Sequence, residues 1–197
     1  MSHLSVTVFC GSSPGTAPDY AAAAQAMGEG IARGGMKLVF GGGNVGLMGV
    51  VASAALREGG HVIGIIPDFL RQREVEFPGL SELIVTDSMH TRKRRLFALA
   101  DAFVVLPGGL GTLDETFEML TWRQLGRHQK PIYLCNVLGW ADAFARLIDS
   151  VIASGFAKPA IREMYEITAD VPSTWPAASD ARTATREAVD ATGMVVS

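Results

Sequence analysis

The chain has 197 residues, of which 48% are hydrophobic and 22 are glycine, and its formal net charge is −3. This length favours a single domain, and the hydrophobic content excludes an intrinsically disordered chain. The small negative charge supplies no positive field for nucleic acid or for an anionic membrane surface, so we expect neither as a partner.

The hydrophobic pattern predicts alternating strands and helices. In chain order they are a strand at Ser5–Phe9, a helix at Pro18–Arg33, a strand at Met36–Phe40, a helix at Gly46–Glu58, a strand at His61–Ile66, a helix at Met89–Ala100, a strand at Ala102–Leu106, a helix at Gly111–Gly126, a strand at Pro131–Cys135 and a helix at Trp140–Ser154. The strands lack strict polar alternation, which indicates a parallel sheet with helices on both faces. The expected fold is an α/β, Rossmann-like doubly wound sheet.

Two segments show less regular patterns. Phe69–Leu83 is a long connection without a clear element, and long loops in compact domains are often functional. Beyond Ile167 the sequence becomes rich in Pro, Ala, Thr and Ser, which predicts a peripheral strand and then a tail without chemistry. We expect one nucleotide-binding hydrolase domain over residues 1–197, with its core at about residues 5–168 and a peripheral tail at residues 169–197.

The loop after the first strand is the first candidate ligand site, because ligands of such sheets bind beyond the carboxyl ends of the strands. Cys10–Gly15 contains small residues that allow close backbone approach, and the hydroxyls of Ser12 and Ser13 can donate to phosphate or ribose. A tight strand-to-helix turn explains the segment equally well, so both interpretations stay open.

The loop after the second strand is rich in glycine. Gly41–Gly46 leads directly into a predicted helix, so backbone N–H groups and a helix N-terminus can converge on an anion there. The loop matches neither the Gly-x-Gly-x-x-Gly dinucleotide fingerprint nor a P-loop. Binding of NAD and ATP-dependent phosphoryl transfer are therefore disfavoured.

The loop Pro107–Glu115 again joins a strand end to a helix start, and it carries carboxylates. If Glu115 lies in the first helical turn, the positive helix terminus favours its ionised form and a ligand on the preceding glycines is within its reach. Thr112 and Glu115 also form a capping-box pattern, in which they only satisfy backbone donors. By pattern alone the capping box is the more common explanation.

Four consecutive cations at positions 92–95 lie near the start of the third predicted helix. Cations near a helix N-terminus oppose the macrodipole, and an anionic ligand would explain them. Neighbours on a helix point about 100° apart, so the four side chains cannot all face one site. We expect two of them to be functional and the others to be solvated.

With Met89–Lys93 and Pro107–Glu115, the chain resembles the Lonely guy (LOG) family, whose members are cytokinin riboside 5′-monophosphate phosphoribohydrolases and were formerly described as lysine decarboxylases. The resemblance runs from about Val6 to Ile167. Position 114 is Asp where many members have Glu.

The resemblance implies a site made of many residues. The catalytic pair would be Arg92 and Glu115. The 5′-phosphate would lie on the loop residues Gly108, Gly109, Gly111 and Thr112, with Gly42 and Gly43 nearby. Ser13 and Met89 would line the site, and the substrate would also contact Glu74, Arg92, Lys93 and Thr121. It also implies a homodimer with active sites near the subunit interface, an AMP-like nucleoside monophosphate as substrate, and no cofactor.

The chemistry suits these residue types. Breaking a ribosyl C–N bond passes through an oxocarbenium-like state, which a carboxylate stabilises. Glu115 could also take a proton from the attacking water, and the fixed donors of Arg92 could orient phosphate, ribose or Glu115 itself.

Other functions are less well supported. A pyridoxal phosphate decarboxylase needs a distinctive lysine, and Lys37, Lys130 and Lys158 show no such setting, whereas Lys93 lies among arginines. The four histidines are scattered and the two cysteines do not match a zinc spacing, so we expect no metal. An AMP or purine nucleotide nucleosidase of broader specificity stays open, as does a non-catalytic nucleotide carrier or sensor.

The expected location is the cytoplasm. No apolar stretch reaches the roughly 18 residues of a membrane span, and the start Met1–Leu4 lacks the features of a signal peptide.

Overall fold

The computed structural model describes residues 4–71 and 74–171. Its strands form a single parallel sheet with the order β4-β3-β2-β1-β5-β6-β7. The strands are β1 (Ser5–Phe9), β2 (Lys37–Phe40), β3 (His61–Pro67), β4 (Glu82–Thr86), β5 (Ala102–Val105), β6 (Ile132–Cys135) and β7 (Glu166–Thr168). The α-helices are α1 (Pro18–Arg33), α2 (Gly46–Arg57), α3 (Met89–Leu99), α4 (Leu110–Gln124) and α5 (Trp140–Ala153). Short 3₁₀ turns lie at Asp68–Leu70, Val137–Gly139 and Pro159–Met164.

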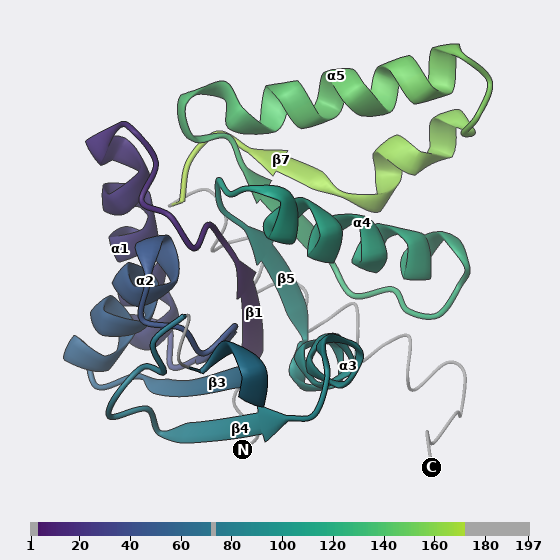
Figure 1. Ribbon diagram of the computed structural model, residues 1–197. Helices are drawn as coiled ribbons and strands as arrows, with labels where there is room; N and C mark the ends of the chain where they lie inside the picture. The colour runs from purple at the N-terminus through teal and green to yellow at the C-terminus, as the bar shows by residue number, and fades with distance from the viewer. Residues whose placement is uncertain (1–3, 72–73, 172–197) are drawn as a thin grey trace.

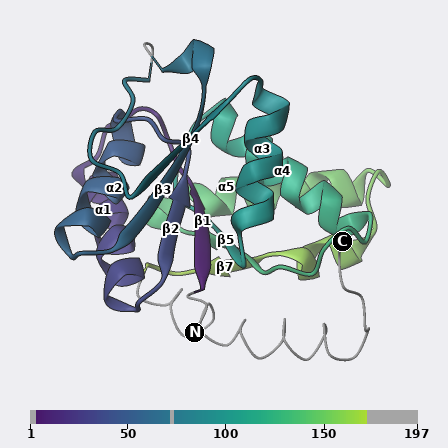
Figure 2. The same ribbon diagram turned by 90° about the horizontal axis from the view of Figure 1, so that it is seen from below.

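The helices cover both faces of the sheet (Figures 1 and 2). On one face, α1 and α2 pack through Met27, Ile31 and Val51 onto one hydrophobic core. On the other face, Leu96 of α3 and Met119 of α4 belong to a second core, together with residues of α5. The α/β, Rossmann-like doubly wound sheet is therefore confirmed.

The strand order reverses at β1, and this reversal locates the candidate site. β1 pairs in parallel with β2 on one side and with β5 on the other. The loops after β1 and β5 consequently begin side by side at the same edge of the sheet, and they lead to helices on opposite faces, α1 and α4. In doubly wound sheets this switch point forms the ligand crevice.

The predicted helices and the five predicted strands agree with the structure to within two residues. β4 was missed, because it lies at the sheet edge and two of its five side chains are exposed, so its hydrophobic signal is weak. The strand expected beyond Ile167 lies slightly earlier, as β7. Residues 172–197 of the expected tail lie outside the described residues.

None of the helices in the described part of the chain is long and apolar enough to cross a membrane.

Candidate active site

The loop after β2 is covered by a segment from the long connection between β3 and β4. The backbone N–H of Asn44 donates to Glu74 O at 3.0 Å, and the N–H of Phe77 donates to Gly42 O at 3.0 Å. Gly43 and Glu76 form an isolated antiparallel bridge. These bonds hold Glu74 against the glycine loop.

The guanidinium of Arg92 is fixed beneath this loop. α3 begins after Ser88, whose hydroxyl caps the helix by accepting from Thr91 N at 3.2 Å. Four residues after this cap, Arg92 is only 5% exposed. Its Nε donates to Ile65 O at 3.1 Å and its Nη2 donates to Gly41 O at 3.0 Å. A Cβ at position 41 would overlap the guanidinium, so a larger residue there would displace Arg92 from this position.

Arg92 also faces Glu74 and Met89. Its Nη2 lies 3.8 Å from Glu74 Oε2, and its Nη1 lies 3.8 Å from the Met89 sulfur. Glu74 Oε2 is buried and accepts no hydrogen bond within residues 4–71 and 74–171. Apart from the family resemblance, no sequence pattern marks Glu74, because its position depends on how a long loop folds back.

The basic run divides into two inward and two outward side chains. Arg92 is buried and Lys93 is partly buried, whereas Arg94 and Arg95 are exposed. Lys93 Nζ lies 2.7 Å from Asp114 Oδ2 of α4. The two inward side chains thus have different partners, since Arg92 contacts the glycine loop and Lys93 contacts α4.

The loop after β5 lies beside the loop after β1. Gly11 N donates to Pro107 O at 3.1 Å, and a Cβ at Gly108 would collide with Thr112 and approach Gly11 N. By contrast, a Cβ at Gly109 or at the exposed Gly111 would meet nothing within 4 Å. The first turn of α4 therefore opens outward, with free space beside its backbone.

The capping-box interpretation of Thr112 and Glu115 is wrong. Gly109 is the N-cap, α4 begins at Leu110, and no side chain caps this helix end. The helix starts earlier than the pattern suggested, so Glu115 lies in the second turn rather than the first. Its carboxyl is consequently available for another role.

The expectation that Glu115 is readily ionised is also wrong. Burial raises its pKa from the usual 4.5 to about 7. The charges of Arg92 and Lys93 lower this pKa and those of Asp114 and Glu74 raise it, but burial has the largest effect. A carboxyl with a pKa near neutrality can both accept and donate a proton at physiological pH.

Cys10, which follows β1 directly, is close enough to Glu115 for the charge of that carboxylate to affect its pKa. Burial raises the pKa of its thiol, and the negative charge of Glu115 raises it further. The thiol therefore stays protonated and is not a nucleophile.

The remaining predicted residues lie at different distances from the Arg92–Glu115 region. Ser13 is exposed in the loop after β1, and Thr112 is buried, with its carbonyl accepting from the Thr116 hydroxyl at 2.7 Å. Thr121 is exposed on α4, six residues beyond Glu115, which places it about 9 Å further along the helix axis. It therefore lies apart from the other predicted residues.

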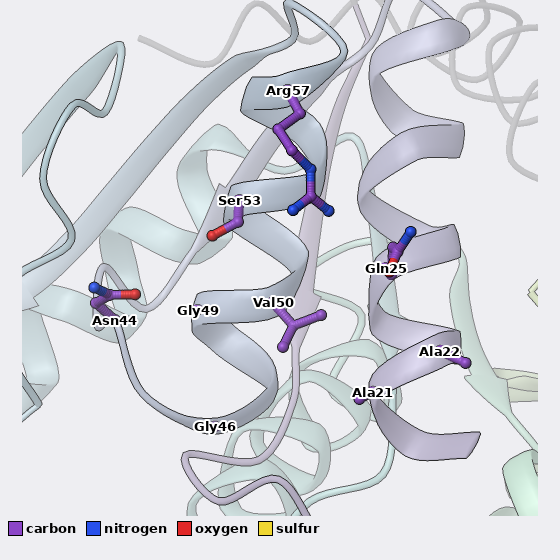
Figure 3. Close-up of a pocket in the computed structure, with 9 residues that line it drawn as sticks. All are labelled: Ala21, Ala22, Gln25, Asn44, Gly46, Gly49, Val50, Ser53 and Arg57. Carbon is purple, nitrogen blue, oxygen red and sulfur yellow. The ribbon is translucent and has the colours of Figure 1, made fainter. Parts of the chain in front are cut away.

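A separate groove of about 470 Å³ runs between α1 and α2 (Figure 3). It is lined by Ala21, Ala22, Gln25, Asn44, Gly46, Gly49, Val50, Ser53 and Arg57. The lining contains part of the glycine loop but neither Arg92 nor Glu115, so the groove is distinct from the site around those two residues. Among the described residues, no group of three or more His, Cys, Asp or Glu side chains could hold a metal ion.

Comparison with known proteins identifies similar chains. Residues 48–177 match the family model described as "Possible lysine decarboxylase". A cytokinin riboside 5′-monophosphate phosphoribohydrolase of Rhodococcoides fascians is 45% identical over 168 residues, covering 85% of this chain and 85% of the relative. An Arabidopsis thaliana protein of the same description is 43% identical over 159 residues, covering 81% of this chain and 73% of the relative.

Solved structures share the fold at lower identity. The Moco carrier protein from Chlamydomonas reinhardtii superimposes with a TM-score of 0.71 at 22% identity, covering 92% of this chain and 99% of that one. The molybdenum cofactor binding protein from Rippkaea orientalis gives a TM-score of 0.69 at 23% identity, covering 91% and 98%. At this identity the likeness shows the fold alone.

Proposed function

The chain belongs to the family described as "Possible lysine decarboxylase", the LOG family, and we therefore propose that it hydrolyses the N-glycosidic bond of a cytokinin nucleoside 5′-monophosphate. The products are the free base and ribose 5-phosphate. The observation that carries the proposal is the carboxyl of Glu115, with a pKa of about 7, within the electrostatic influence of the buried Arg92.

In the proposed reaction the bond between ribose C1′ and the base nitrogen breaks, and positive charge develops on the sugar. The ionised form of Glu115 stabilises this charge and takes a proton from the attacking water. The water oxygen bonds to C1′ as the bond to the base breaks, and the proton that Glu115 took from the water is given up to the departing base nitrogen, so that Glu115 is ionised again. Arg92 is held by two backbone carbonyls, so its position is set before substrate binds.

The 5′-phosphate is proposed to bind at the open first turn of α4. The backbone N–H groups of a helix N-terminus attract anions, and Gly109 and Gly111 leave space for a close approach. Gly108 and Thr112 complete this loop. Further contacts are proposed for Ser13, Gly42, Gly43, Glu74, Met89, Lys93 and Thr121.

We also propose a homodimer in the cytoplasm, with each active site near the interface. Leu110 and Leu125, at the two ends of α4, are 86% and 69% exposed, which suits burial by a second subunit. Thr121 lies on the same helix, so it would lie at the subunit interface if a partner packed on α4.

Two lysines have settings that disfavour lysine-based decarboxylation. Burial opposes the charge of Lys93, but its pairs with Asp114 and Glu118 raise its pKa overall. Lys130 Nζ donates to Phe97 O at 2.7 Å and lies over the Phe97 ring. The Lys93 ammonium is paired with two carboxylates and the Lys130 amine with a carbonyl oxygen, whereas a Schiff-base lysine needs a free amine.

The test is to incubate the protein with isopentenyladenosine monophosphate and, separately, with AMP, and to measure free base and ribose 5-phosphate by chromatography. Preferential release of isopentenyladenine supports the proposal. Equal release of adenine from AMP indicates the broader nucleotide nucleosidase. Nucleotide binding without product would refute the hydrolase and indicate a carrier or sensor.

A further inference from the structure

A compact ion cluster joins α3 to α4 beside the proposed active site. Lys93 Nζ of α3 lies 2.7 Å from Asp114 Oδ2 and 3.3 Å from Glu118 Oε2 of α4. The side chains of Lys93 and Glu118 are only 17% and 22% exposed, whereas that of Asp114 is 59% exposed. Two carboxylates thus share one ammonium, and the inner one is Glu118.

Glu118 depends on Lys93 for charge compensation. Its Oε2 is buried and accepts no hydrogen bond in the described part of the chain, so the ammonium at 3.3 Å is the opposite charge next to it. A carboxylate oxygen that is buried without a hydrogen bond is costly unless a cation is held close. The pair therefore constrains the Lys93 side chain as well as Glu118.

The cluster lies on the helix face that carries Glu115. Residues three and four apart on a helix are neighbours, so Glu118 is adjacent to both Asp114 and Glu115. We propose that Glu118 is a positioning residue for the reaction: with Asp114 it holds the Lys93 ammonium against α4 and so sets the charge that Glu115 experiences. This inference rests on the proposed function.

Charged groups from several elements influence Glu115. They are Arg92 and Lys93 of α3, Asp114 of α4 and Glu74 of the loop before β4, and Glu115 in turn acts on Cys10 at the end of β1. Arg92 is fixed by backbone carbonyls, whereas Lys93 has only side-chain carboxylates to hold it among the described residues. Lys93 is therefore the cation whose position Glu118 can control.

The test is a titration of the Glu115 carboxyl in the ligand-free protein, followed by its ¹³C chemical shift and assigned with Glu115→Gln. Lys93→Met removes the cation and should raise the Glu115 pKa, and Glu118→Gln releases that cation from its position and should raise the same pKa, each by about half a unit or more. The acid limb of the kcat/KM profile should move in the same direction.

Two variants serve as second test and control. Glu118→Asp keeps the negative charge but shortens the side chain that reaches Lys93, so it should also raise the Glu115 pKa even if Glu118→Gln does not fold. Glu29→Gln is the matched control, because Glu29 is 25% exposed and pairs with Arg33 one turn away on α1. It should leave the Glu115 titration unchanged.

Two outcomes overturn the inference. One is a Glu115 titration that none of the variants moves, with only the melting temperature lowered, which would make the cluster a structural tie. The other is a lower Glu115 pKa in Glu118→Gln, which would mean that Glu118 acts through its own charge and not by positioning Lys93. Because the titration needs no turnover, a protein that cleaves no nucleotide would refute the proposed function while this test still decides the role of Glu118.

Discussion

Replacing Glu115 by Gln should stabilise the protein at alkaline pH while abolishing its activity. The folded state raises the pKa of this carboxyl from 4.5 to about 7, so the folded protein binds the proton more tightly than the unfolded chain does. Stability is therefore lost as the pH rises from about 4.5 to about 7, and it is flat above that range. Gln cannot ionise and does not incur this cost.

The size of the effect follows from the pKa change. At about 1.4 kcal/mol per pKa unit the full cost is about 3.5 kcal/mol, and partial solvent access reduces the expected gain to about 1–3 kcal/mol. For a domain of this size each kcal/mol changes the melting temperature by roughly 2–4 °C. Activity should fall by at least about 100-fold, because the proton acceptor is lost.

The assay is urea unfolding of the wild-type protein and Glu115→Gln between pH 4.5 and 8.5, with product release measured in parallel. The free-energy difference should grow in favour of Gln up to about pH 7 and then stay constant. A variant that is less stable than wild type at pH 8, or a difference that does not depend on pH, would refute the argument. Loss of stability with activity retained would mean that Glu115 only supports the helix.

Two further substitutions test Arg92 and the proposed phosphate loop. Arg92→Lys keeps the charge but cannot replace both hydrogen bonds, to Ile65 O and to Gly41 O. We expect kcat/KM to fall by about 100-fold or more and the stability, measured by urea unfolding, to fall by about 1–2 kcal/mol. Near-normal kinetics would contradict the proposed role of Arg92. Gly109→Ala places a methyl group in open space at a φ of −95°. The free energy of unfolding should therefore change by less than about 0.5 kcal/mol, whereas the KM for the nucleotide should rise about tenfold or more. An unchanged KM would exclude phosphate from that helix end.

Much of the architecture could be predicted because it depends on local sequence. Apolar runs such as Ser5–Phe9 and Ala102–Leu106 are buried on both sheet faces, and that burial requires a continuous hydrophobic pattern. Gly42 has a positive φ and Gly108 packs closely against Thr112 and Gly11, so both positions disfavour larger residues. β4 was not predicted because an edge strand exposes part of its surface, so its hydrophobic pattern is weaker.

The fold class, the loops at the strand ends and the residue types that the chemistry needs could all be predicted from the pattern of residues. The protonation of Glu115 could not, since it depends on where helix α4 begins, at Leu110, and on burial beside Arg92. The tertiary structure also decided that Glu74 meets Arg92 and that Glu118 pairs with Lys93. The physical reason is that hydrophobic periodicity reports short-range order, whereas burial and charge proximity depend on segments far apart in the chain.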